Sequence, residues 1–353
     1  MINERILRRY PQLVKMLTGL EAEMFWALAQ KAEVALEAQE KLLRERPGRK
    51  HAPGAGRPYE HPMCIRVAVV MSYMRLHVSQ DLVAALLGVT QTDVWRELRR
   101  LQPLLREILP VPEVWAVEEE QEGNTGGGGG VAGDEKPAAV AVGERLGAEA
   151  LADGRALVDA TEQEVERSQD SEERKKHYSG KQKTFTLKTQ LVTDGERHIV
   201  AISEAVPGTM HDKKLSDETQ TVERLPNGCE ADADKGYQGM ATGVPVVTVR
   251  NVETGEEQQV PRVTVKTPFK KPPKGELTEE QKEFNRALAQ IRVRVEHCIG
   301  WVKNWWIFAT RYRCAHSIYT PLMQVVCGIV NWVTSEREKL AGRPLAATAC
   351  SAP

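Results

Sequence analysis

The sequence predicts an all-helical domain followed by an α/β domain, and three observations support this. Apolar residues recur at helical spacing through most of residues 1–105. The pattern is then interrupted by an acidic run containing five consecutive glycines, which cannot form a packed element. From Arg155 the apolar period becomes that of strands. We therefore expect a helical domain at 1–115, a linker at 116–150, an α/β domain at 151–340 and a disordered tail at 341–353.

Composition excludes several classes of protein. The chain has 353 residues, of which 41% are hydrophobic and 27% charged, as in ordinary globular proteins rather than fibres. The charged amino terminus lacks an apolar signal core, and no run approaches the ~18 to 20 apolar residues of a membrane span. The six cysteines show no C-x-x-C spacing, which argues against a zinc site or a disulfide framework. We expect a cytoplasmic protein with reduced thiols and no membrane partner.

The formal net charge of −1 conceals a segregation of charge along the chain. Residues 113–173 contain 17 acidic and 4 basic side chains, a net charge of −13, whereas residues 250–313 contain 13 basic and 8 acidic ones, a net charge of +5. Exposed charges act only over a Debye length of about 8 to 10 Å, so local fields matter more than the total. A near-neutral total therefore does not exclude a nucleic-acid partner.

The first domain begins with two predicted helices across residues 1–46. A basic segment rich in proline and glycine follows, R-P-G-R-K-H-A-P-G-A-G-R-P-Y. We expect an exposed loop there. It is either a solvated linker or an arm that contacts phosphate backbone. A strongly apolar helix is then predicted from Met63 to Leu76.

Residues 79–105 have the pattern of a helix-turn-helix. Ser79 is placed to cap one helix, Gly88 to make the turn, and Thr90 to cap the second helix with Asp93 three residues on. Two helices joined by a glycine turn also occur in domains that do not bind DNA, but the arginine-rich second helix favours DNA contact. Its expected outer face consists of Gln91, Thr92, Trp95, Arg96, Arg99 and Arg100.

The α/β domain begins with three predicted strands. R-A-L-V-D-A is a short apolar strand, K-T-F-T-L-K-T-Q-L-V-T-D alternates, and R-H-I-V-A-I-S-E is joined to the second by a tight turn at Asp194-Gly195. This order is typical of an antiparallel meander. A helix is predicted after Pro207-Gly208, followed by the short strand C-E-A-D-A-D and a glycine turn. A last apolar helix is expected from about Thr320 to Leu340.

A long amphipathic helix is predicted from Leu277 to Trp306. Its expected buried stripe consists of Phe284, Leu288, Ile291, Val295, Ile299, Val302 and Trp306. Beside the stripe, Arg292, Glu296 and Lys303 fall within an arc of roughly 40° at ~100° per residue. The two bases either support a solvated helix face or bind phosphate. The helix is rigid, so the acid between them can be aimed at a site.

Three carboxylates are the candidates for chemistry: Asp159 and Asp234, which end predicted strands, and Glu296 on the long helix. Each alone is weak evidence, because acids at strand ends usually cap turns or face water. Together they could converge on Mg²⁺ or Mn²⁺, which prefer oxygen ligands. Two such ions ~3.5 to 4 Å apart stabilise the attacking and leaving oxygens of phosphodiester displacement. Asp232 competes with Asp234 for the second position.

The motifs carry a resemblance to a known family. V-D-A-T-E, Y-S-G-K-Q-K-T-F-T-L-K-T-Q, P-G-T-M-H-D, A-D-K-G-Y-Q-G and N-R-A-L-A-Q-I-R-V-R-V-E-H-C-I-G-W-V-K resemble DDE transposases of bacterial insertion sequences, in the branch related to Harbinger-type endonucleases. The resemblance spans about 155–335. It implies an RNase H-like domain, a mixed sheet flanked by helices, whose catalytic and metal-binding acids are Asp159, Asp234 and Glu296. The family's D-x-G-Y pattern favours Asp234 over Asp232.

The resemblance also bears on the long helix. Related transposases carry the signature Y-x2-R-x3-E-x6-K, and Arg292, Glu296 and Lys303 match its last three members. Ala289 stands in place of the tyrosine, so no tyrosine role carries over. His211 and Asp212 belong to a recurring motif, either as a helix-start cap or as support for the metal site.

The function implied is that of a transposase that binds terminal inverted repeats and performs metal-dependent strand cleavage and strand transfer. The implied cofactor is a pair of Mg²⁺ ions, for which Mn²⁺ can substitute. The partners are inverted-repeat and target DNA, with the protein a homo-oligomer on paired ends and nucleoid-associated when bound. The alternative is a DNA-binding regulator, derived from a transposase, that no longer cleaves. Base contacts are expected from Gln91 or Thr92, and phosphate contacts from Arg96, Arg99, Arg100, Arg262, Lys266, Lys270, Lys271, Lys274, Arg292 and Lys303.

Overall fold

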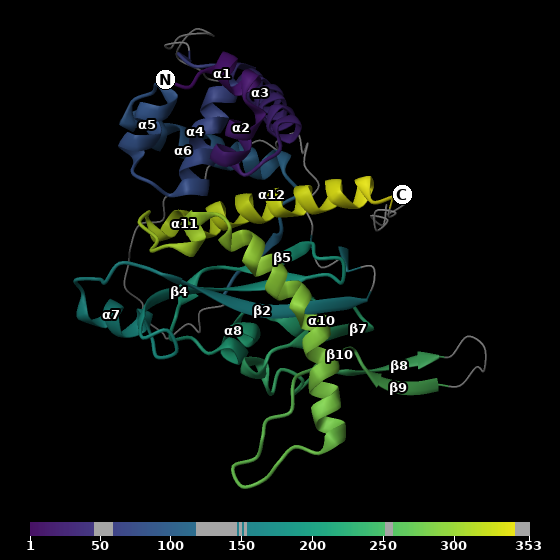
Figure 1. Cartoon of the computed structure of the whole chain (residues 1–353). Coiled ribbons are helices and arrows are strands. Elements are labelled where there is room, and N and C mark those ends of the chain that lie inside the picture. The colour runs from purple at the N-terminus through teal and green to yellow at the C-terminus, as the bar shows by residue number, and fades with distance from the viewer. Residues whose placement is uncertain (46–58, 118–146, 148–149, 152–153, 251–256, 343–353) are drawn as a thin grey trace. The chain divides into compact units, whose positions relative to one another are not determined.

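The computed structural model describes residues 1–45, 59–117, 147, 150–151, 154–250 and 257–342 (Figure 1). Almost all of the basic segment at 46–59, most of the linker at 116–150 and nearly all of the tail at 341–353 lie outside the described residues. The described chain forms two compact units. The first comprises 1–109 with 303–310, and the second comprises most of the remainder.

The first unit is helical. Its helices are α1 (Glu4–Arg9), α2 (Pro11–Thr18), α3 (Ala22–Glu45), α4 (Met63–Leu76), α5 (Gln80–Leu87), α6 (Gln91–Ile108) and α11 (Trp306–Ala309). The prediction of two helices across 1–46 was wrong, because the chain forms three there. Pro11 begins a new helix, and Gly19, at φ 73°, ends it in the left-handed region.

The turn between α5 and α6 has the local chemistry that its sequence predicts. The Ser79 side chain accepts a hydrogen bond from the backbone N–H of Leu82, and Gly88 adopts φ 72°. Thr90 and Asp93 form a reciprocal capping box at the start of α6. On the inner side of α6, Glu97 is buried and accepts a 2.8 Å hydrogen bond from Arg66 of α4. This buried ion pair ties α6 to α4 and was not predicted.

The second unit is built on an eight-stranded mixed sheet. Its path runs β1 (Glu113–Trp115), β5 (Ile199–Ser203), β4 (Thr184–Thr193), β2 (Arg155–Glu164), β7 (Cys229–Ala233) and β10 (Val263–Lys266), while β3 (Tyr178–Ser179) and β6 (Val206–Pro207) pair with β4. The antiparallel pairing of β2 with β4 and of β4 with β5 is the predicted meander. Strands β7 and β10 add in parallel, and β1, a strand that was not predicted, pairs in parallel with β5.

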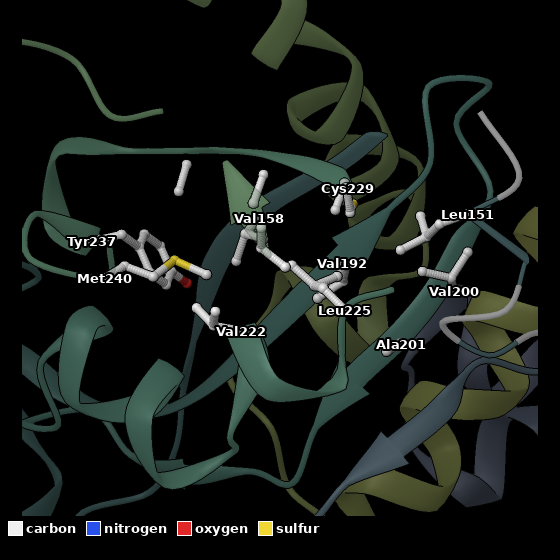
Figure 2. Packing of buried hydrophobic residues seen from close by; sticks show 14 of the residues in the cluster. Leu151, Val158, Val192, Val200, Ala201, Val222, Leu225, Cys229, Tyr237 and Met240 are labelled. Carbon is white, nitrogen blue, oxygen red and sulfur yellow. The ribbon is translucent and has the colours of Figure 1, made fainter. Parts of the chain in front are cut away.

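The sheet's register decides which side chains share a face, because successive residues of a strand point to opposite sides. Val158 pairs with Ala233 of β7 and with Val192 of β4. These three residues belong to one buried core, shown in Figure 2, in which Tyr237 and Met240 lie near Val222. Asp159, the next residue of β2, therefore points to the other face.

Helices and turns connect and cover the strands. They are α7 (Ser171–His177), α8 (Asp212–Glu218), α9 (Thr221–Arg224), the 3-10 turns η2 (Lys235–Tyr237) and η3 (His316–Ile318), α10 (Glu279–Lys303) and α12 (Tyr319–Leu340). In Figure 1, α10 crosses the sheet and the hairpin of β8 (Val246–Arg250) and β9 (Glu257–Pro261) extends from its edge. No helix in the described part of the chain is long and apolar enough to cross a membrane.

The predicted stripe of α10 was partly wrong. The fully buried positions are Leu288, Arg292, Val295, Cys298 and Val302. The predicted positions Phe284, Ile291 and Ile299 are only half-buried, and Trp306 is 54% exposed. The helix ends at Lys303, and Trp305 takes a non-helical conformation, so the periodicity stops before Trp306. The charged Arg292 therefore lies on the buried face of α10 rather than beside it.

Candidate active site

Three elements of the second unit bring the predicted acids together. Asp159 lies within β2, Asp234 directly follows β7, and Glu296 lies on α10. Strands β2 and β7 run parallel, with Val158 opposite Ala233. Asp159 and Asp234 are the residues that follow these two, so they lead toward the same face of the sheet. Alternation therefore directs Asp159 toward α10, from which Glu296 and Arg292 extend one helical turn apart.

The guanidinium of Arg292 joins the three acids. Its nitrogens lie 3.0 Å from Asp234 Oδ1, 3.3 Å from Asp159 Oδ2 and 3.9 Å from Glu296 Oε1. The Arg292 side chain is 8% exposed, whereas those of Asp159, Asp234 and Glu296 are 20%, 40% and 55% exposed. The site thus has a buried cation at its base and carboxylates of increasing exposure above it.

Asp232 occupies a different environment from Asp234. It is fully buried, and neither of its carboxylate oxygens has a hydrogen-bond partner among the described residues. It forms an ion pair with Arg155, at 3.6 Å. Burial, partly offset by the charges of Arg155 and Lys266, raises the pKa of Asp232. The structure therefore groups Asp234, not Asp232, with Asp159 and Glu296 around Arg292.

Asp159 is the most buried acid of the group. Burial raises its pKa to about 6, although Arg292 and a 2.8 Å hydrogen bond from the backbone N–H of Ala160 act in the opposite direction. The negative charges of Asp234 and Glu296 add to the increase. Burial disfavours the ionised form of Asp159, and a further cation beside it would favour that form.

The donor set fits a hard divalent cation in kind, since it consists of carboxylate oxygens from β2, the residue after β7 and α10. Within the described ranges, no group of three acidic, histidine or cysteine side chains is already close enough to hold an ion. Arg292 instead lies among the carboxylates, within ion-pair distance of all three. On binding metal, the three acids would therefore lose their contacts with Arg292 and gain contacts with the ion.

The other expected residues of α10 and the PGTMHD motif have simpler placements. Lys303 is the half-buried last residue of α10, and Ala289 is exposed on the same helix. His211 caps α8, because its Nδ1 accepts a 3.3 Å hydrogen bond from the backbone N–H of Lys213. Asp212 instead pairs with Lys188, at 2.8 Å.

The second candidate surface is the outer side of α6 in the first unit. Gln91, Thr92, Arg96, Arg99 and Arg100 are all exposed there. Several are held by neighbours: Gln91 donates to Gln80, Arg96 pairs with Asp93 at 2.5 Å, and Arg99 lies 5.7 Å from the ring centre of Trp95. The predicted outer face is thus exposed, and its arginines are oriented by local contacts.

The basic cluster at 262–274 is divided in the structure. Lys270, Lys271 and Lys274 are exposed on the loop before α10. Arg262 instead donates to the backbone carbonyls of Leu225 and Val222. Lys266 pairs with Glu230 at 2.8 Å. The loop lysines are the accessible part of this cluster, although Lys271 also contacts Glu276 at 2.6 Å.

A mixed sheet flanked by helices, with acids grouped on one face, is consistent with a nuclease of the DDE type. Residues 158–331 match the DDE superfamily endonuclease family. This match, to just under half of the chain, confirms the resemblance of its motifs to DDE transposases and implies dependence on divalent metal.

A relative from Microchaete diplosiphon, described as a probable transposase for insertion sequence element IS702, is 32% identical over 176 residues. The alignment covers 50% of this chain and 56% of the relative, so this chain spans little more than half of that protein. No solved structure matches significantly.

The raised pKa of Asp159 predicts a stability effect in the metal-free protein. Because the folded pKa of about 6 exceeds the ordinary value of 3.8, Asp159 contributes stability that is fully present below pH 3.8 and is lost as the pH rises through 6. Asp159→Asn should remove this loss. Relative to wild type, the variant should gain up to about 3 kcal/mol between pH 4 and pH 7. Urea unfolding of both proteins in EDTA measures it, and a constant difference across this range would contradict the assigned environment.

Proposed function

We propose that this protein is an insertion-sequence transposase, which binds the terminal inverted repeats of its element and cuts and joins DNA strands with Mg²⁺. The observation that carries the proposal is the convergence of Asp159, Asp234 and Glu296 on one point in a DDE superfamily domain. The sheet order, an antiparallel meander extended by parallel strands, supports an RNase H-like fold for that domain.

In this proposal the three carboxylates would hold the metal ions, which supply Lewis-acid stabilisation to attacking and leaving oxygens. No side chain is needed as a covalent nucleophile. Water attacks in hydrolysis, and a liberated 3′ hydroxyl attacks in strand transfer. The three carboxylates would keep the ions in fixed positions, because β2, the end of β7 and α10 are rigid. Their graded exposure leaves the outer side of the site open to a phosphodiester.

Arg292 has two roles in this account. In the ion-free protein its guanidinium offsets the repulsion among the three acids. A guanidinium and a divalent ion compete for the same carboxylate oxygens, so Arg292 must give up these contacts when the ions bind. It is then placed at the site to bind a DNA phosphate in two places, as its planar fork allows. Lys303 and the loop lysines Lys270 and Lys271 would add phosphate contacts.

The first unit would read the DNA. Its α5 and α6 form the proposed helix-turn-helix, with Gln91 or Thr92 on base edges and Arg96, Arg99 and Arg100 on phosphates. Paired element ends require two catalytic centres, so the active form would be a homo-oligomer on DNA. The alternative, a DNA-binding regulator that no longer cleaves, is disfavoured because all three acids are present and lie within ion-pair distance of Arg292.

The first prediction from this proposal concerns cleavage. Asp159→Asn, Asp234→Asn and Glu296→Gln should each abolish Mg²⁺-dependent cleavage of the element's ends, because each removes a charged ligand. Binding to those ends, measured by gel shift, should remain within a few-fold of wild type. Asp232→Asn is the matched control and should retain cleavage. Activity in Asp234→Asn combined with its loss in Asp232→Asn would contradict the assignment.

The second prediction concerns DNA reading. Alanine at Arg96, Arg99 and Arg100 should weaken binding and reduce the slope of log affinity against log salt by about one unit per lost phosphate contact. Gln91→Ala should instead change base preference, as competition with altered repeat sequences would show. Lys31→Ala, on a helix outside the α5–α6 pair, serves as the control. An unchanged salt slope in the triple variant would exclude α6 as the phosphate-binding helix.

A further inference from the structure

A second polar cluster lies on the face of the sheet opposite Asp159. Glu162 is three residues after Asp159 on β2 and so points the other way, and it pairs in register with Lys188 of β4. Lys188 is 7% exposed, yet its Nζ donates to Asp212 Oδ1 at 2.8 Å and to the Met210 carbonyl at 2.6 Å. Glu162 lies 3.8 Å from the same ammonium. A buried ammonium with these partners holds the start of α8 against the sheet.

Two glycines allow the close approach that this cluster requires. A Cβ at Gly208 would collide with the Oγ1 atom of Thr186, whose hydroxyl donates to Glu162 at 2.8 Å. A Cβ at Gly236 would collide with Asp212 Oδ2 and lie 3.0 Å from Asp212 Cγ. Gly236 does not have a positive φ, so its requirement for glycine is one of space rather than of backbone conformation. One oxygen of Asp212 thus pairs with Lys188 while the other lies against Gly236.

Gly236 belongs to the turn that carries Asp234. Asp234 directly precedes the 3-10 turn η2, and its carbonyl accepts a 3.0 Å hydrogen bond from the backbone N–H of Tyr237. Tyr237 is fully buried in the core shown in Figure 2. Burial, followed by the charges of Asp212, Asp159 and Asp234, raises the pKa of Tyr237 well above its ordinary value. The last residue of the turn, Tyr237, is thus anchored in the core, and Asp212 lies against its middle residue, Gly236.

We propose that Asp212, oriented by Lys188, is a positioning residue for Asp234: it sets the turn through Gly236 and so sets the affinity of the three acids for metal. This inference rests on the proposed function, because it takes Asp234 as a metal-binding acid. It assigns a task to the second residue of the His211-Asp212 pair, which does not touch the reacting atoms. Groups that orient metal-binding side chains typically change metal affinity about 10- to 100-fold when they are replaced.

The test is a double-mutant cycle in which Mn²⁺ binding to the full chain, without DNA, is measured by electron paramagnetic resonance. The variants are Gly236→Ala, Asp212→Ala and the double variant. Gly180→Ala, alone and with Asp212→Ala, is the matched control, because a Cβ at Gly180 meets nothing within 4 Å. The urea midpoint of every variant is measured in parallel.

Gly236→Ala should weaken Mn²⁺ binding about 10- to 100-fold, because its methyl group displaces either Asp212 or the turn. The double variant should bind no worse than Asp212→Ala alone, since the clash is gone once the carboxylate is removed. Gly180→Ala should have no effect. A purely structural role would lower the urea midpoint and leave Mn²⁺ affinity in native buffer unchanged, which would overturn the inference. Losses that multiply in the double variant would also overturn it.

Asp212→Asn provides a second route should Gly236→Ala not fold. It keeps the shape of the side chain and removes the charge that Lys188 holds, so about 10-fold weaker Mn²⁺ binding is expected and unchanged binding would overturn the inference. Failure of the proposed function gives a different result. If wild-type protein neither binds Mn²⁺ nor cleaves its element's ends, both the proposed function and the positioning role of Asp212 are overturned. Cleavage by wild type with unaltered Mn²⁺ affinity in these variants overturns the positioning role alone.

Discussion

The guanidinium of Arg292 lies between three carboxylates that would otherwise repel one another, and this contact links β2, the turn after β7 and α10. A single cation on the buried face of α10 offsets this repulsion and fixes the helix over β2 and β7. In the proposed function the same contact would prepare the site for metal, because the acids lie where a stronger cation could replace the arginine.

The sheet makes this gathering possible and separates two tasks. On one face, Asp159 meets α10 and the proposed chemistry. On the other, Glu162, Lys188 and Asp212 hold α8 against the sheet, and Asp212 lies against the turn that begins at Asp234. Asp159 and Glu162 are three residues apart on β2, so their side chains lie on opposite faces of the sheet. Because side chains alternate between the two faces of a strand, β2 contributes Asp159 to the acid cluster and Glu162 to the contacts that hold Asp212 beside the turn at Gly236.

Much of this arrangement could be predicted from local patterns. Alternation predicted the meander of β2, β4 and β5, and capping residues predicted the α5–α6 turn. The burial of Arg292 could not be predicted from the helical pattern, in which charged residues are assumed to face solvent. It depends on Asp159 and Asp234, which are distant in sequence. The short strand β1 was missed because three residues show no period, and the end of α10 because Trp306 still matched the helical spacing. Gly236 was read as a turn residue, although the space taken by Asp212 is what requires glycine.

The most direct test of the central contact is a Mn²⁺ titration of Arg292→Gln beside wild type, without DNA and at neutral pH. Arg294→Gln is the matched control, since Arg294 lies on the same helix and donates to the Gly195 carbonyl instead of the acids. If Arg292 competes with metal and then binds DNA phosphate, Arg292→Gln should bind Mn²⁺ about tenfold more tightly, roughly 1.4 kcal/mol, while cleaving DNA more slowly. Mn²⁺ affinity equal to or weaker than that of wild type would contradict the account.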